Sequence, residues 1–404
     1  SSKGLTRIKD PDMPGLMSAE AENLVHLGNT RDDFHELADC DWVAEAVVER
    51  LDVKQDLYHR LNKCCKASAI ITSNTSTIPI KLLTEGMPRE FCERFAITHF
   101  FNPVRFMRLL ELVRGEHTKN DVVDTLAMFS ELQLGKGVVL CADTPGFLAN
   151  RVGVFAIQCA LHNAFDLGLA PTEADAFFGR PLGFPKTGVF GLYDLIGIDL
   201  MVDVVKSLVN ILPANDAFHQ YSAPIDFMTN MIANGQTGNK NNKGFYRDDG
   251  EERQVISLIN GDYIPYERLR APLVEKAERE GISTLLNDNG RFGLYVWRAL
   301  SETLCYAASL VPEVTEDLTQ IDDAMKLGYN WVKGPFELLD EIGVEYFIDR
   351  LQKDGREVPS FLTMGLENGF YTDKKTGLSS LDANGFFFPI VRPKGVLQIG
   401  RAHV

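Results

Sequence analysis

The sequence lacks a basic excess and long apolar runs. Its 404 residues include 41 Lys+Arg against 56 Asp+Glu, which gives a formal net charge of −15. So negative a chain is a poor partner for nucleic acid or for an anionic membrane surface, and we expect it to bind neither. No apolar run reaches the roughly 18–20 residues that cross a bilayer, so we also expect no membrane span.

The sequence also lacks a secretory signal and paired cysteines. Its start, SSKGLTRIKD, has no apolar stretch followed by a small-residue cleavage site. The seven cysteines are odd in number, and none forms a CxxC pair with metal-ligand spacing. We therefore predict reduced, mostly buried thiols, no metal site and a cytoplasmic location. The globular composition and the length together suggest two or three domains.

In its first part the chain alternates between predicted strands and helices. Apolar stretches predict five strands, at 41–49, 68–75, 94–101, 108–115 and 137–143. Helical spacing predicts helices at 51–65 and 120–133; the first is expected to bury the face formed by Val53, Leu57, Leu61 and Cys64. This order favours an α/β layer with at least partly parallel strands.

One expected feature of a dinucleotide-binding sheet is missing. A complete sheet of this kind carries GxGxxG after its first strand and an acidic residue after its second. The 404 residues contain no GxGxxG. We therefore predict half of a Rossmann sheet over residues 1–143, with the chain opening inside the connection to the third strand. The Pro-Gly pair at 145–146 marks the boundary of this domain.

The second part of the chain contains an internal repeat. Residues 188–197, GVFGLYDLIG, match residues 334–343, GPFELLDEIG, and a Gly-Phe-Tyr follows each copy, at 244–246 and at 369–371. The match predicts a duplicated helical domain, with a first copy at 144–286 and a degenerate second copy at 287–375. Residues 261–284 read as a linker leading into a charged surface helix. The tail, 376–404, is expected to lie extended over the surface.

A histidine and a glutamate are the first candidates for chemistry. His99 ends an apolar strand, and Glu111 lies 12 residues later in the middle of the next one. The two strands are joined through the turn at 102–103, so the carboxylate can meet the imidazole across the pair. Such a pair provides a base near neutral pH. The alternative is a partly buried histidine with a salt-bridging glutamate, and spacing alone favours that alternative.

Three further polar groups have two interpretations each. The run 73–77, SNTST, ends a strand where open α/β sheets bind ligands, but Ser, Asn and Thr also form turns and helix caps. Asn150 and Arg151 lie one turn inside the helix that opens the second domain, and Asn150 is expected to face either a cleft or solvent. The basic cluster 240–243 meets either a phosphate or only water.

Four motifs together carry a family resemblance. SNTST, THFFNP, LLELV and ADTPGFLANR, in this order, resemble the L-3-hydroxyacyl-CoA dehydrogenase family. The resemblance covers residues 41–246, and a looser second copy of the family's helical domain covers 291–371. It implies an incomplete Rossmann-type NAD-binding domain followed by two tandem all-α domains of the family's C-terminal type.

The resemblance also implies an activity and roles for residues. The family oxidises the 3-hydroxyl of a CoA thioester in fatty-acid β-oxidation, with NAD+ as hydride acceptor. By motif position, His99 is the expected general base and Glu111 orients it. Ser76 and Asn150 are expected to hydrogen-bond the substrate. The expected cofactor contacts are Glu49, Lys54, Asn74, Asn102 and, less specifically, Lys240.

Partners follow from the same resemblance. It implies an acyl-CoA substrate, a homodimer formed through the helical domains, and a fused or associated enoyl-CoA hydratase/isomerase module, as in the longer fatty-acid oxidation proteins. The second copy departs from the pattern, with Val296, Trp297 and Arg298 in place of Asn150 and Arg151. We therefore predict that it is a structural pseudo-repeat.

Two other functions stay open at this point. The absent glycine-rich loop favours a catalytically silent acyl-CoA-binding or assembly fragment. A related NAD-dependent dehydrogenase of small hydroxy acids is the other, although DTPGFLANR followed by a long helical domain fits it less well.

Overall fold

The computed structural model divides into two compact units, residues 1–147 and 148–404. It describes residues 9, 15, 16, 18–248, 250, 252–269, 271–374 and 377–391. The division falls after Phe147, whereas the sequence placed the domain boundary after Asp143.

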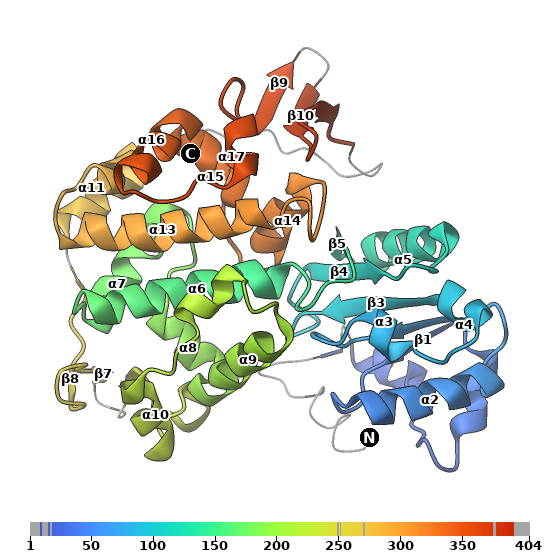
Figure 1. Ribbon diagram of the computed structural model, residues 1–404. Helices are drawn as coiled ribbons and strands as arrows, with labels where there is room; N and C mark the ends of the chain where they lie inside the picture. Colours follow the sequence, from blue (N-terminus) through green and yellow to red (C-terminus); the bar gives the residue numbers. More distant parts are fainter. Residues whose placement is uncertain are drawn as a thin grey trace. The chain divides into compact units, whose positions relative to one another are not determined.

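A five-stranded sheet forms the centre of the first unit (Figure 1), in the order β1-β2-β3-β4-β5. Neighbouring strands are parallel except for β3 and β4, which are antiparallel. The predicted α/β layer with partly parallel strands is therefore confirmed. The strands are β1 (Trp42–Glu45), β2 (Ile70–Ser73), β3 (Phe95–Phe100), β4 (Leu109–Arg114) and β5 (Gly137–Cys141).

Helices cover both faces of this sheet. Successive strand residues point to opposite faces. The ring of Phe95 therefore contacts Tyr58 on one face, with centroids 5.1 Å apart, while Ala96 packs against Val122 and Leu126 on the other. β3 and β4 are buried along almost their whole length, as expected for a sheet covered on both sides. The helices are α2 (Leu51–Cys64), α3 (Ile80–Leu83), α4 (Arg89–Glu93) and α5 (Asn120–Leu132).

The buried face of α2 differs from the predicted one. Of the four residues predicted to share it, only Leu61 is buried. Lys54 and Tyr58 are buried instead, with 1% and 0% of their surface exposed. Both reach Glu45 with their polar ends, at 2.8 Å and 2.6 Å. A buried hydrogen-bond acceptor therefore determines the orientation of this helix, and the spacing of its apolar residues does not.

The second unit is mainly helical, with two small antiparallel sheets (Figure 1). Its two longest helices, α6 (Ala149–Asp166) and α13 (Arg291–Ser309), lie antiparallel and side by side. The ring of Phe155 stacks on Tyr306 with centroids 4.2 Å apart, and further along the pair the Cys159 Sγ lies 3.8 Å from the Ala299 carbonyl oxygen.

The remaining elements surround this helix pair. The helices are α7 (Pro171–Phe177), α8 (Phe190–Ile196), α9 (Ile198–Ile211), α10 (Asp226–Ala233), α11 (Pro272–Glu280), α12 (Ser283–Leu286), α14 (Leu318–Gly328), α15 (Pro335–Ile342), α16 (Val344–Lys353) and α17 (Ser360–Met364). One sheet contains β6 (Tyr246–Asp248), β7 (Arg253–Ile256) and β8 (Tyr263–Pro265), and the other contains β9 (Tyr371–Lys374), β10 (Gly377–Leu381) and β11 (Phe387–Pro389).

The repeated sequence motif makes the same contact twice. The carboxylate of Asp194 accepts hydrogen bonds from the last two backbone N–H groups of 244–246, at 2.8 Å and 2.7 Å. Asp340 does the same for 369–371, at 2.8 Å and 2.9 Å. A Cβ on the glycine of either motif would lie 2.0 Å or 2.7 Å from an aspartate Oδ1. This close approach explains why each motif begins with glycine.

A second pair of aspartates repeats in the same way. Asp175 accepts hydrogen bonds from two N–H groups in the first turn of α8, at 2.7 Å and 3.0 Å, and from the Tyr246 hydroxyl at 2.8 Å. Asp322 binds two N–H groups in the first turn of α15, at 2.8 Å and 3.1 Å, and the Tyr371 hydroxyl at 2.8 Å. Each carboxyl thus joins a helix start to a strand of the small sheet that follows it.

Part of the segment predicted as an extended tail pairs in a sheet instead. β10 lies between β9 and β11, and Ser379, Ser380 and Leu381 are buried. Residues 392–404 lie outside the described residues. In the predicted linker, α11 corresponds to the expected charged helix and β8 precedes it.

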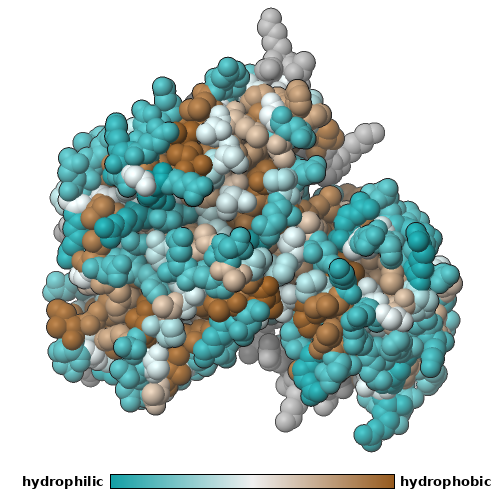
Figure 2. All heavy atoms as spheres, viewed as in Figure 1, coloured by the Kyte–Doolittle hydropathy of each residue, from teal (hydrophilic) through white to brown (hydrophobic). Residues whose placement is uncertain are grey.

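The outer surface is largely polar. Hydrophilic residues cover most of the face of each unit that Figure 2 shows, interrupted by smaller hydrophobic areas. Among the residues that the structure describes, no helix is long and apolar enough to cross a membrane.

Replacing Asp340 with alanine is expected to destabilise the fold without weakening substrate binding. The change leaves two N–H groups without their acceptor, which should lower the free energy of unfolding by about 2–4 kcal/mol. Urea denaturation measures this loss, and Asp373→Ala, on an exposed residue of β9, is the control. A large loss of acyl-CoA affinity in a still-folded Asp340→Ala variant would contradict the structural role.

Stability is expected to fall as the pH rises from 5 to 7. Burial raises the pKa of Asp322 to about 8 and that of Asp175 to about 7. Across this range the folded protein holds protons that the unfolded chain has released, so each group contributes a slope of up to about −1.4 kcal/mol per pH unit.

The Asp322→Asn variant isolates one of these slopes. Its free energy of unfolding should depend less steeply on pH than that of the unaltered protein, by up to about 1.4 kcal/mol per unit. Asp323→Asn, on the half-exposed neighbour, should keep the original slope. Equal slopes in the Asp322→Asn variant and the unaltered protein would show that Asp322 is ionised in the fold.

Candidate active site

The histidine and the glutamate predicted to meet across two strands do so. In the antiparallel pair of β3 and β4, His99 lies directly opposite Glu111. The His99 Nδ1 is 2.6 Å from the Glu111 Oε2. Glu111 is fully buried and His99 is 7% exposed. Residues 101–108 connect the two strands, and the register of the pair brings the two side chains together.

This geometry assigns different tasks to the two imidazole nitrogens. Because the carboxylate occupies Nδ1, proton exchange with a substrate would take place at Nε2. Two aromatic rings flank the imidazole: the centroid of Phe101 lies 4.6 Å from it and that of Phe147 lies 6.0 Å from it. The pair can therefore accept a proton in a mostly apolar setting, with Glu111 stabilising the imidazolium that forms.

The end of β2 is tied to the strands on either side of it. The backbone N–H of Asn74 donates to the Glu45 carbonyl at 2.7 Å. The Asn74 Oδ1 accepts from the backbone N–H of Phe100, the residue after His99, at 2.9 Å. These bonds bring the carboxyl ends of β1, β2 and β3 together, which is the ligand-binding edge of an open α/β sheet. Ser76 follows in this loop and is half-buried.

A buried ion pair lies at the same edge, and the sequence analysis did not anticipate it. The Glu45 carboxylate accepts hydrogen bonds from Lys54 at 2.8 Å, from the Tyr58 hydroxyl at 2.6 Å and from the Ser73 hydroxyl at 2.7 Å. Burial alone would raise the pKa of Glu45, but these donors hold it below its ordinary value. An acidic residue inside the apolar run WVAEAVVE was the available signal.

The other predicted cofactor residues of this unit differ in exposure. The Glu49 side chain is 39% exposed, lies 3.2 Å from the Lys54 Nζ and accepts hydrogen bonds from the hydroxyls of Thr75 and Thr77. Asn102 follows β3 and is exposed. The buried ammonium of Lys54 lies between the carboxylates of Glu45 and Glu49. Lys54 therefore holds Glu49 in position and offers almost no exposed surface to a ligand.

Asn150 and Lys240 belong to the second unit. Asn150 is half-buried in the first turn of α6. Its neighbour Arg151 is buried, with only 1% of its surface exposed. The Lys240 Nζ forms an exposed ion pair with Asp199, 2.6 Å from its Oδ1.

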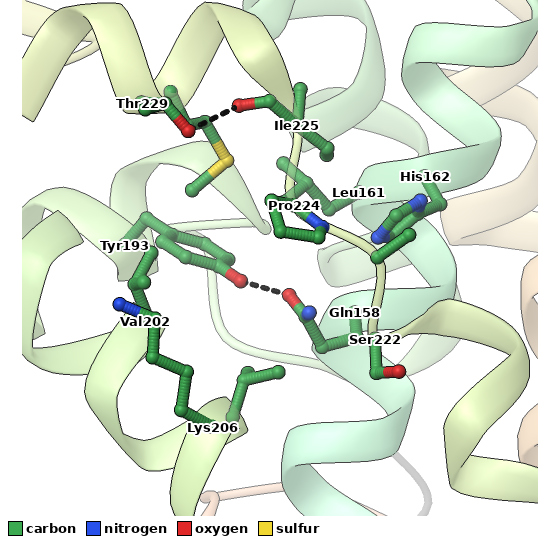
Figure 3. Close-up of a pocket in the computed structure, with 13 residues that line it drawn as sticks. Gln158, Leu161, His162, Tyr193, Val202, Lys206, Ser222, Pro224, Ile225 and Thr229 are labelled. Carbon is green, nitrogen blue, oxygen red and sulfur yellow. Dashed lines mark hydrogen bonds between the residues drawn. The ribbon is translucent and has the colours of Figure 1, made fainter. Parts of the chain in front are cut away.

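The second unit also holds a cavity of about 60 Å³ between α6, α8, α9 and α10 (Figure 3). The Tyr193 hydroxyl and Gln158 form a hydrogen bond at its wall, and most of its lining is apolar. His162 lies on this wall, and burial lowers its pKa, which favours the neutral imidazole. None of the predicted site residues lines the cavity, so it is separate from the candidate chemistry. Among the described residues, no cluster of His, Cys, Asp and Glu side chains could hold a metal.

Comparisons with known proteins agree with this geometry. Residues 5–144 match the NAD-binding domain of 3-hydroxyacyl-CoA dehydrogenase, and residues 146–248 and 293–365 match the C-terminal domain of the same enzyme family. A hydroxyacyl-coenzyme A dehydrogenase, mitochondrial, from Rattus norvegicus is 33% identical over 250 residues, which are 61% of this chain and 76% of that protein. The chain belongs to the 3-hydroxyacyl-CoA dehydrogenase family.

Longer relatives match as well. A protein of Rickettsia prowazekii named as a fatty acid oxidation complex trifunctional enzyme is 39% identical over 321 residues, which are 78% of this chain and 44% of that protein. The chain thus spans less than half the length of this relative. The crystal structure of 3-hydroxybutyryl-CoA dehydrogenase from Escherichia coli K12 has a TM-score of 0.66 with 24% identity, covers 90% of this chain, and shows that the fold is shared.

Removing one member of the buried ion pair of the first unit is expected to lower the free energy of unfolding strongly. Replacing both members together is expected to lower it much less. Glu45→Gln leaves the buried Lys54 ammonium with the part-exposed Glu49, 3.2 Å away, as its remaining anionic partner, which should lower the free energy of unfolding by about 3 kcal/mol. The double variant Glu45→Gln/Lys54→Met should recover most of that loss, because the buried charge itself is gone. Asp52→Asn, which breaks an exposed pair with Arg50, should change stability little. A double variant no more stable than Glu45→Gln would contradict this account.

Proposed function

We propose that this chain oxidises L-3-hydroxyacyl-CoA to 3-ketoacyl-CoA with NAD+ in fatty-acid β-oxidation. The observation that carries the proposal is the contact of 2.6 Å between His99 and Glu111, built into a buried strand pair. His99 takes the proton of the substrate's 3-hydroxyl at Nε2, and Glu111 holds the imidazole in the tautomer that can accept it.

Two polar side chains complete the proposed substrate site. Ser76, in the loop after β2, donates a hydrogen bond to the substrate oxygen as it becomes a carbonyl. Asn150, in the first turn of α6, binds the thioester region. Holding the substrate in this way supplies orientation, which is a large part of the rate enhancement in a reaction between two bound molecules.

The residues present fit the nicotinamide half of NAD. NAD+, when bound, accepts the hydride from the substrate carbon. Glu49 offers exposed carboxylate surface that Lys54 and two threonine hydroxyls hold in place, and carboxylates at this edge of such sheets bind ribose hydroxyls. Asn74 and Asn102 follow β2 and β3 at the same edge, while Lys240 is the proposed contact from the second unit.

The tandem arrangement of the helical part is also a proposal. Two copies of the family's C-terminal domain are supported by the paired contacts of Asp194 with Asp340 and of Asp175 with Asp322. We place the copies at 144–286 and from 287 onward, with β10 and β11 as the counterparts of β7 and β8.

The partners of this enzyme follow from the proposal. Relatives named for the fatty acid oxidation complex support association with an enoyl-CoA hydratase/isomerase activity, which produces the 3-hydroxyacyl-CoA that this site consumes. A homodimer through the helical domains and a cytoplasmic location remain expectations of the same proposal.

Acetoacetyl-CoA-dependent oxidation of NADH by the full protein tests the proposed activity. His99→Gln should lower kcat by about 10²–10⁴-fold, because it removes the proton-transferring group. Glu111→Gln should lower kcat as well, with a smaller change in KM. His59→Gln, on an exposed residue of α2, is the control and should retain full activity.

The outcomes separate the proposed functions. Equal activity in the unaltered protein and in His99→Gln would reject His99 as the base. No activity in the unaltered protein, with acyl-CoA still bound, would favour the catalytically silent fragment, for which the absence of GxGxxG is the supporting observation.

A further inference from the structure

A buried arginine lies beside the proposed substrate residue of α6. The Arg151 Nη1 contacts the Glu313 Oε1 at 2.6 Å, its Nη2 pairs with Asp216, and its Nε donates to the Tyr306 hydroxyl at 3.2 Å. That hydroxyl in turn donates to the Asp216 Oδ1 at 2.9 Å. All three donor groups of the guanidinium are thus held by different side chains.

Two of these partners come from the second copy of the helical domain. Tyr306 lies in α13 and Glu313 lies in the segment between α13 and α14. Tyr306 also stacks on Phe155, one helical turn further along α6. Burial raises the pKa of Tyr306, so its hydroxyl remains a donor at neutral pH. The second copy therefore contacts the start of α6 in three ways: by an ion pair, by a hydrogen bond and by an aromatic stack.

The long helix of the second copy, α13, has no buried arginine at the position that matches Arg151. At the matching position of α13 stands Trp297, whose indole N–H donates to Asp354 at 2.6 Å, a residue of the same copy. The first copy holds the start of α13 by other residues: Glu173 pairs with Arg291 at 2.8 Å, and Phe177 stacks on Phe292 with centroids 4.3 Å apart. The buried guanidinium with three partners is therefore particular to the helix that carries Asn150.

A guanidinium held on three sides has little rotational freedom. Its planar fork matches carboxylates at fixed angles, and charge-assisted bonds to it are short and directional. Because Arg151 and Asn150 are successive residues in the first helical turn, fixing one backbone position fixes the next. Side chains at successive helix positions point about 100° apart, so a buried Arg151 leaves Asn150 at the helix flank, where it is half-buried.

We propose that Tyr306 and Glu313 are positioning residues, which fix the first turn of α6 through Arg151 and thereby orient Asn150 toward the acyl-CoA thioester. The inference rests on the proposed role of Asn150 in the dehydrogenase. It assigns to the second copy a task in the reaction beyond packing: one copy carries the substrate residue and the other holds it in place.

Kinetics of the full protein test this coupling. Tyr306→Phe keeps the ring stack and removes the hydroxyl, and Glu313→Gln removes one charge. Each should lower kcat about 10-fold with little change in the KM for acetoacetyl-CoA, because a misplaced group affects the transition state more than ground-state binding. In an Asn150→Ala background the same substitutions should have no further effect, since the residue they orient is gone.

The matched control lies at the other end of the same helix pair. Arg291 of α13 and Glu173 also join the two copies, at 2.8 Å, near the end of α6. Glu173→Gln should leave kcat unchanged although it breaks an ion pair between the two copies, in this case one with a part-exposed arginine. An unchanged kcat in Tyr306→Phe, or losses that add fully to that of Asn150→Ala, would overturn the inference and leave the dehydrogenase activity itself intact.

Amide hydrogen exchange gives a readout that needs no activity. Tyr306→Phe should speed exchange in the first turns of α6, whereas Glu173→Gln should leave exchange there unchanged. Unchanged exchange at the start of α6 in Tyr306→Phe overturns the inference. If the unaltered protein oxidises no NADH, the proposed function fails on its own, and the exchange experiment still decides whether the second copy fixes this turn.

Discussion

A carboxylate taken out of water needs hydrogen-bond donors around it, and this requirement organises both units. The first unit buries Glu45 on β1 and Glu111 on β4, and the second buries Asp194 and Asp322 among the residues that join its helices to its small sheets. A chain with a net charge of −15 has many acids to place on its surface. The burial of these four carboxylates therefore indicates that each accepts hydrogen bonds that an apolar side chain could not accept.

What a buried carboxylate does depends on whether its partner can titrate. Asp194 and Asp340 bind backbone N–H groups, which never change charge, so they can only hold a loop in place. Glu45 binds the ammonium of Lys54 and anchors α2 on the sheet. Glu111 differs because its partner is an imidazole, a side chain suited to proton transfer. The same physical requirement therefore produces structure at three sites and, under the proposed function, chemistry at the fourth.

The sequence predicted the features that depend on local spacing. The strands follow from short apolar runs, and the meeting of His99 and Glu111 follows from the pairing of two strands that are successive in the chain. The sequence did not predict the environment of Arg151, whose partners Tyr306 and Glu313 lie 155 and 162 positions away. The periodicity of apolar residues carries no information about contacts between residues so far apart in the sequence. The orientation of α2 was missed for a related reason, since apolar spacing cannot show that Glu45 attracts a lysine and a tyrosine to the buried side.

The proposed duplication accounts for which residues the second copy kept. Asp322 and Asp340 satisfy buried N–H groups of their own copy, so losing either would cost stability wherever the copy stands. A substrate residue has no such internal duty, and the second copy has Val296 at the position of Asn150. Its long helix was then free to change on the face toward α6, where Tyr306 meets Arg151. Under the proposed function, a copy without a substrate residue can still stabilise the geometry of the copy that has one, and the three contacts on Arg151 are the form that such a division of tasks would take.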